Sequence, residues 1–130
     1  MEFPAAIESL PQMLEYLRGC LTKSHVKKPQ LRDIELCCEE AVVNIIMHGA
    51  VKEGGIAMEC ESNSHHFSIT ILDQGIPFNP IDIEIDPRID RPLDERKVGG
   101  LGLYLIRRLA SDISYTRKNN TNILKITFRF

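Results

Sequence analysis

The chain has 130 residues, of which 43% are apolar and 26% charged, and its formal net charge at pH 7 is −2. This length suits a single domain with a buried core, which we place at residues 1–130. The charge gives no electrostatic reason to expect binding to nucleic acid or to an anionic membrane. No apolar run reaches the roughly 18 residues of a membrane-spanning helix. The start Met1-Glu2-Phe3-Pro4 lacks the features of a signal peptide, so we expect a cytoplasmic protein.

The N-terminal half predicts two helices. Ser9-Leu10-Pro11-Gln12 has the pattern of a capping box, so the first helix is expected to begin near Ser9 and to be followed by a polar connection at residues 22–28. The second helix is expected at about residues 29–49, because apolar residues recur there at helical spacing, at Leu31, Ile34, Cys38, Ala41 and Ile45.

The C-terminal half predicts strands with one more helix. Residues 56–61 and 67–72 are short, apolar and partly β-branched, and we expect them to pair antiparallel. Residues 79–98 contain prolines and mixed charges and predict a loop that acts as a lid. A helix is expected from residues 100–102 to 111, and a closing hairpin at residues 113–117 and 123–130. Together these elements predict an α+β fold: a two-layer sandwich of a mostly antiparallel sheet with helices on one face.

The cysteines indicate no metal site. Cys20, Cys37, Cys38 and Cys60 lack the spacing of zinc ligands. Cys37 and Cys38 are adjacent in the second expected helix. We interpret all of them as small buried apolar residues of a protein in a reducing compartment.

A stripe of polar residues along the second expected helix is the first candidate site. Glu40, Asn44 and His48 are spaced by four, so they share one face beside the apolar stripe and can line a pocket. Glu39 is rotated by about 100° from Glu40, which selects Glu40 as the site carboxylate. An amide oxygen such as that of Asn44 suits Mg²⁺, and a carboxylate one turn away can accept a proton from an attacking hydroxyl or water. The alternative is a solvated helix face.

A second candidate site lies at the end of the 67–72 strand. Asp73 is followed there by Gln74-Gly75-Ile76-Pro77. A carboxylate in this place can accept a hydrogen bond from an exocyclic amine, which adenine has and guanine lacks at that position. Gly75 would let the backbone approach the base closely. The alternative is an ordinary turn that ends the strand.

A third candidate site is glycine-rich. Gly99-Gly100-Leu101-Gly102-Leu103 comes just before the third expected helix. Glycines free the backbone to direct N–H groups at phosphate oxygens, and the N-terminus of the helix adds partial positive charge. Lys97 can add further positive charge. The alternatives are a glycine-rich hinge and, for Lys97, a solvated loop.

In this order the three segments resemble the nucleotide-binding motifs of the Bergerat-fold ATPase superfamily, and most of all its anti-sigma-factor serine kinase branch. Residues 40–49, 73–80 and 100–106 resemble the first, second and third motif of that branch. The resemblance covers nearly the whole chain and implies a Bergerat ATP-binding fold.

The resemblance implies an ATP- and Mg²⁺-dependent kinase. Such a protein phosphorylates a serine of a small anti-sigma-factor antagonist protein and can bind a sigma factor, often as a dimer. The resemblance makes Glu40 the general base and Asn44 the magnesium ligand. It assigns adenine contacts to Asp73 and Gly75. The other motif positions that we count as cofactor-binding are His48, Pro77, Lys97, Gly99, Gly100, Leu101, Gly102 and Leu103, of which Gly100 and Gly102 form the phosphate cradle.

Two features depart from the branch, and two other functions compete. The strand that usually precedes the first helix is nearly absent, and the glycine often found before the last strand is replaced around Asn120-Thr121-Asn122. One competing function is a non-catalytic switch that binds ATP or ADP and sequesters a partner; Glu40 argues against it, because a pure binder needs no base. The other is an ATPase fragment of a larger machine, against which the lack of a transducer domain argues.

Overall fold

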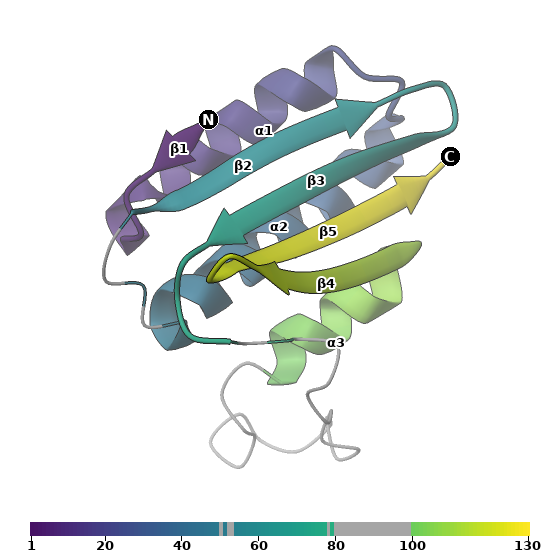
Figure 1. Ribbon diagram of the computed structural model, residues 1–130. Coiled ribbons are helices and arrows are strands. Elements are labelled where there is room, and N and C mark those ends of the chain that lie inside the picture. The colour runs from purple at the N-terminus through teal and green to yellow at the C-terminus, as the bar shows by residue number, and fades with distance from the viewer. Residues whose placement is uncertain (50, 52–53, 78, 80–99) are drawn as a thin grey trace.

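A sheet of antiparallel strands forms one layer of the molecule, and helices cover one face of it (Figure 1). The structure is a computed structural model that describes residues 1–49, 51, 54–77, 79 and 100–130. In these residues the sheet has five strands in the order β1-β2-β3-β5-β4. The strands are β1 (Glu2–Phe3), β2 (Ile56–Ser62), β3 (His66–Asp73), β4 (Asp112–Lys118) and β5 (Thr121–Arg129). The predicted α+β fold with an antiparallel sheet is confirmed.

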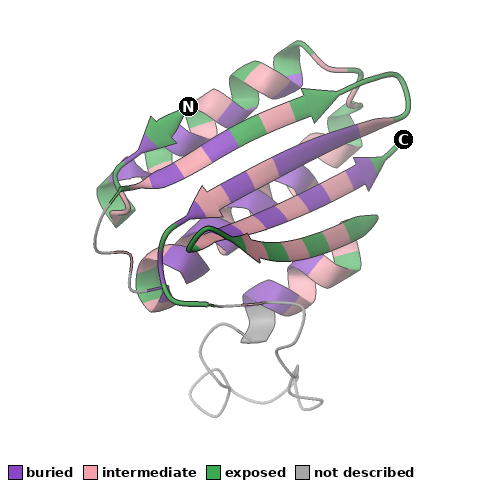
Figure 2. Cartoon of the chain, in the orientation of Figure 1, coloured by how far each residue is buried: buried purple, intermediate pink, exposed green. Residues whose placement is uncertain are grey.

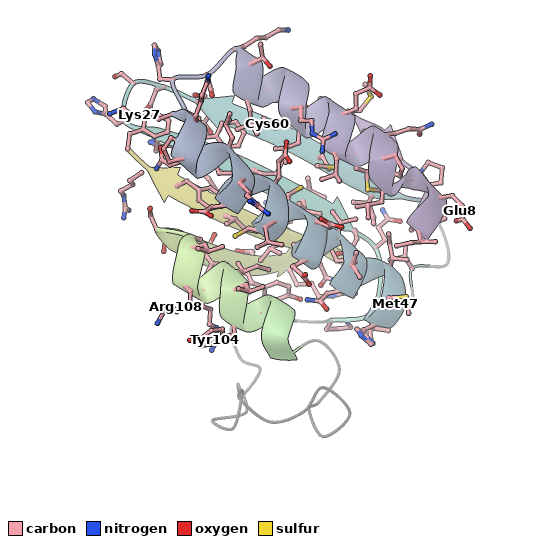
Figure 3. All side chains as sticks on the ribbon, turned by 180° about the vertical axis from the view of Figure 1, so that it is seen from behind. Glu8, Lys27, Met47, Cys60, Tyr104 and Arg108 are labelled. Carbon is pink, nitrogen blue, oxygen red and sulfur yellow. The ribbon has the colours of Figure 1, made fainter. Side chains whose placement is uncertain are left out.

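The helices lie side by side across the sheet. They are α1 (Leu10–Thr22), α2 (Lys28–His48) and α3 (Gly100–Leu109). Figure 3 shows the molecule from the helical side, with α2 between α1 and α3. Because α2 is central, its inward face is fully buried at Ile34, Cys37, Cys38 and Val42. No helix in the described part of the chain is long and apolar enough to cross a membrane.

The core fills the space between the two layers. Side chains of β3 and β5 alternate between buried and partly exposed positions, as expected of strands with one covered face (Figure 2). Ile69, Ile71 and Ile126 have no exposed surface on the sheet side, and Met13 and Leu17 of α1 have none on the helix side. Burial of this apolar area from water drives the two layers together.

The first helix begins next to Ser9, as predicted, but Ser9 does not cap it. A short 3-10 helix at Ile7–Ser9 precedes α1, and Ser9 already has a helical backbone with φ −83° and ψ −12°. Its side chain caps no backbone N–H. The capping box was therefore wrong, because the chain turns helical one step earlier. The last extended residue is Ala6, with φ −139° and ψ 148°.

The closing hairpin is confirmed and sets the register that matters for the site. Asn119 and Asn120 have φ angles of 53° and 59°, in the left-handed region that two-residue hairpin turns require and that asparagine tolerates. The strands joined by this turn pair along their length, and β5 also pairs with β3. Asn122 thereby lies opposite Asp73 on β3 and opposite Arg117 on β4.

The cysteines divide into two pairs. All four thiols are free. Cys37 and Cys38 are buried, and burial raises the pKa of each thiol to about 12. Cys20 and Cys60 are only partly buried. The prediction of core positions is thus confirmed for the pair on α2 and not for the other pair.

Candidate functional site

A cavity opens between α2 and the sheet. It measures about 360 Å³ when the open space at its mouth is included. Side chains and backbone from α2, β3, β4 and β5 line it: Ala41, Asn44, Ile45, Gly49, Asp73, Tyr115, Asn122 and Leu124. The fold therefore brings Asn44 of the first predicted motif and Asp73 of the second to one cavity.

Asp73 lines this cavity, and we call the part around it the base end, after its predicted contact with an adenine base. It is the last residue of β3, as predicted, and only 4% of its surface is exposed. Its Oδ1 accepts hydrogen bonds from the backbone N–H of Gly75, at 2.9 Å, and from Asn122 Nδ2, at 3.1 Å. Within the described residues Oδ2 accepts none, so this carboxylate retains an acceptor for a ligand.

Asn122 is the main residue of the site that sequence reasoning missed. It is 4% exposed, and its Nδ2 also donates to the carbonyl of Ile76 at 2.8 Å. Its Oδ1 accepts from Arg117 Nη1 at 2.9 Å and from the hydroxyl of Tyr115. The sequence did show that the segment around Asn122 departs from the related motif. Only the pairing of β3 with β5 identifies Asn122 as the neighbour of Asp73.

Gly75 packs where no side chain fits. Ile76 N–H donates to the carbonyl of Gly49 at 2.8 Å, which holds the loop after β3 against the end of α2. A Cβ built on Gly75 would overlap that same Gly49 oxygen and lie 2.9 Å from Asp73 Oδ1. Close backbone approach thus explains this glycine. Its contact with an adenine ring stays a prediction.

Asn44 lines the same cavity from α2, and we call the part around it the phosphate end, after its predicted role beside Mg²⁺ and the phosphates. The side chain is 6% exposed, and its Nδ2 is buried without a hydrogen-bond partner in the described part of the chain. Most buried amides in proteins are paired, and an unpaired one costs free energy. The fold therefore does not use this amide, and an oxygen-rich ligand would satisfy it. A single protein oxygen also fits Mg²⁺, which usually keeps waters and phosphate oxygens as its other ligands.

Glu40 lies one helical turn before Asn44, at the contact of α2 with α3. A Cβ built on Gly102 would overlap its Oε2, so Gly102 of α3 makes room for the carboxylate. Partial burial raises the pKa of Glu40, and the negative charge of neighbouring Glu39 raises it further. A carboxylate with a raised pKa is a stronger base than an ordinary one. Glu40 borders the site but does not line the cavity.

The remaining predicted residues fall into three groups. Gly100 and Leu101 are the first residues of α3, and Leu103 in the same turn is 4% exposed. His48, the last residue of α2, and Pro77, which is exposed, do not line the cavity. Lys97, Gly99 and all but the first residue of the predicted lid at 79–98 lie outside the described residues.

Comparisons with known proteins identify the family of this domain. A family described as histidine kinase-like ATPase domain matches residues 3–128. A serine/threonine-protein kinase, BtrW of Bordetella bronchiseptica, is 30% identical over 96 residues, which cover 72% of this chain and 67% of the relative. The serine-protein kinase RsbW of Bacillus thuringiensis is 28% identical over 129 residues, which cover 95% of this chain and 80% of the relative.

Solved structures show the same fold at lower identity. The histidine kinase AdeS of Acinetobacter baumannii superposes with a TM-score of 0.51 at 19% identity over 76% of this chain. The histidine kinase domain of a blue-light activated histidine kinase of Erythrobacter litoralis superposes with a TM-score of 0.50 at 17% identity, also over 76% of this chain. This chain covers 46% and 44% of those two chains, so the likeness concerns the fold of one part of each.

Proposed function

The chain belongs to the histidine kinase-like ATPase family, and we propose that it is an ATP-dependent protein serine kinase. Its substrate in this proposal is a serine of a small anti-sigma-factor antagonist protein, and its second partner is a sigma factor. The observation that carries the proposal is the buried, unpartnered amide of Asn44 in a cavity shared with Asp73. The kinase names of BtrW and RsbW support the same reaction.

Different described residues would bind the adenine, the metal ion and the phosphates. Asp73 accepts a hydrogen bond from the exocyclic amine of adenine through Oδ2, while Ala41, Ile45 and Leu124 give the base an apolar enclosure. Asn44 holds Mg²⁺ through its amide oxygen. When bound, Mg²⁺ neutralises the charge that develops on the phosphate oxygens. The backbone at the start of α3, together with Gly99 and Lys97, holds the phosphates.

Glu40 carries the chemical step. The serine hydroxyl of the partner gives its proton to the Glu40 carboxylate while its oxygen forms a bond to the γ-phosphorus of ATP. The bond from that phosphorus to the bridging oxygen breaks, and ADP leaves. Glu40 suits this role because a raised pKa lies closer to the pH of the surrounding solution, which favours general base catalysis.

Glu40→Gln separates a kinase from a binder. The amide keeps the shape of the carboxylate, so ATP affinity measured by calorimetry should stay at the wild-type value. Transfer of labelled phosphate to a candidate antagonist protein should fall by about 10²–10⁴-fold, the usual contribution of a positioned general base. The matched control is Glu39→Gln, which removes the same charge one residue away and should transfer at the wild-type rate at pH 7.

Two outcomes would contradict the proposal. Wild-type transfer by Glu40→Gln would place the base elsewhere. ATP binding by the wild type without transfer to any antagonist would favour the non-catalytic switch, in which ATP or ADP controls the sequestration of a partner.

A further inference from the structure

One guanidinium nitrogen ties the loop after β3 to the last strand. Nη1 of Arg117 donates to the carbonyl of Gly75 at 3.0 Å and to Asn122 Oδ1 at 2.9 Å. Arg117 lies on β4, directly opposite Asn122. It belongs to none of the three motifs and does not line the cavity, so any influence on a ligand passes through the two groups that it holds.

The hydrogen bonds around Asn122 allow only one orientation of its amide. Arg117 and Tyr115 both donate to Oδ1. Nδ2 then faces two acceptors, Asp73 Oδ1 and the carbonyl of Ile76. A flipped amide would set its NH₂ group against the guanidinium and its oxygen against two other oxygens. Arg117 therefore keeps the donor side of Asn122 directed at Asp73.

This arrangement determines which ligand group Asp73 can accept. Asn122 Nδ2 and the backbone N–H of Gly75 both bind Oδ1, so rotation of the carboxylate would break two hydrogen bonds. The oxygen left for an adenine or guanine base is Oδ2, which as a carboxylate oxygen accepts. The exocyclic amine of adenine donates to it. The carbonyl oxygen that guanine carries at that position would meet it as a second acceptor, which is unfavourable in a buried site.

We infer that Arg117 is a positioning residue that sets the preference for adenine over guanine, by holding Asn122 and the Gly75 carbonyl in place around Asp73. The inference rests on the proposed binding of ATP and adds a residue that determines base selectivity. Arg117 does not contact the nucleobase in this proposal and acts through Asn122 and Gly75. Its effect is therefore expected in the ratio of ATP affinity to GTP affinity.

Calorimetry with Mg²⁺ and ATP or GTP tests the inference on the intact chain. Arg117→Met keeps much of the side-chain length and removes both donors, so the ATP-to-GTP affinity ratio should fall about tenfold, as for the loss of one charge-assisted hydrogen bond. Arg117→Lys should retain most of the ratio, because a single nitrogen makes both bonds in the wild type. Lys118→Met removes an equal charge from the next, exposed position of β4 and should leave the ratio unchanged.

A second variant covers the case in which Arg117→Met does not fold. Asn122→Ala removes the donor to Asp73 Oδ1 and should lower the same ratio to a similar extent. A wild-type ratio in Arg117→Met, or in Asn122→Ala when only that variant folds, would overturn the inference while ATP binding stands. Failure of the wild type to bind ATP would overturn the proposed function itself, so the two failures are distinguishable.

Discussion

The two ends of the cavity are built differently. At the base end, Asp73, Asn122 and Arg117 satisfy one another and the backbone of the loop after β3. At the phosphate end, Asn44 has a buried amide nitrogen without a partner in the described residues, and Glu40 has a carboxylate whose pKa is raised by burial. Among the described residues, the first end lacks a partner for Asp73 Oδ2, an acceptor, and the second lacks one for Asn44 Nδ2, a buried donor.

This difference has an energetic meaning. A satisfied buried network holds its groups in one geometry and costs little, whereas an unpaired buried group costs free energy until a partner arrives. Proteins retain such costs mainly where function requires them. In the proposed function, the base end would select the ligand by shape and hydrogen bonding, and the phosphate end would act on it.

The largest effect on folding is expected at the base end, from Gly75→Ala. The new Cβ would overlap the backbone oxygen of Gly49, which cannot move without disturbing the end of α2. The free energy of unfolding should fall by about 3 kcal/mol, the upper part of the usual range for overpacking. Urea denaturation measures this loss, and a change below about 0.5 kcal/mol would show that the loop is not held against α2.

Gly102→Ala should have a far smaller effect on folding, because its obstacle is a side chain. The Cβ would meet the Glu40 carboxylate, which can swing away. Alanine also favours the helix, so the free energy of unfolding should change by less than about 1 kcal/mol. Phosphate transfer should fall by about 10²-fold, because a displaced Glu40 carboxylate is poorly oriented to accept the proton of the serine hydroxyl. A wild-type transfer rate in this variant would mean that the position of Glu40 is unimportant.

The smallest effect is expected in the pH dependence of transfer. The reaction needs ionised Glu40, so its rate should fall as the pH drops through the raised pKa, which lies above 4.5. For folding, the raised pKa means that ionised Glu40 is unfavourable; this cost is present at neutral pH and is relieved as the pH falls through that pKa.

Glu39→Gln removes the smaller of the two causes of this shift. The acid limb of its pH–rate profile should therefore move to lower pH. Glu59→Gln, at an exposed position of β2, should not move it. An acid limb that stays at the wild-type pH in Glu39→Gln would argue against Glu40 as the titrating group.

Much of this architecture could be predicted from the sequence because it depends on local periodicity. Apolar spacing located α2 and placed Glu40 and Asn44 on one face, and the short, apolar and partly β-branched run before Asp73 located β3. The capping box at Ser9 was wrong although α1 begins next to it, because the pattern cannot show that the preceding residues are already helical.

The rest of the site depends on contacts between distant segments. Asn122 and Arg117 reach Asp73 and Gly75 only through the register of β3, β5 and β4. Gly75 was predicted to admit a ligand, and the structure shows that it also admits the carbonyl of Gly49, which follows α2. Neither relation leaves a periodic pattern in the sequence.

The most direct test of the difference between the two ends is the unfolding free energy of two leucine variants. Without nucleotide, Asn44→Leu removes an unpaired buried amide and should stabilise the protein by about 1–3 kcal/mol, whereas Asp73→Leu leaves the Gly75 N–H unpaired and should destabilise it by a similar amount. With Mg²⁺ and ATP, only the wild type should gain stability. Destabilisation by Asn44→Leu, or a gain with Mg²⁺ and ATP equal to that of the wild type, would contradict this account of the phosphate end.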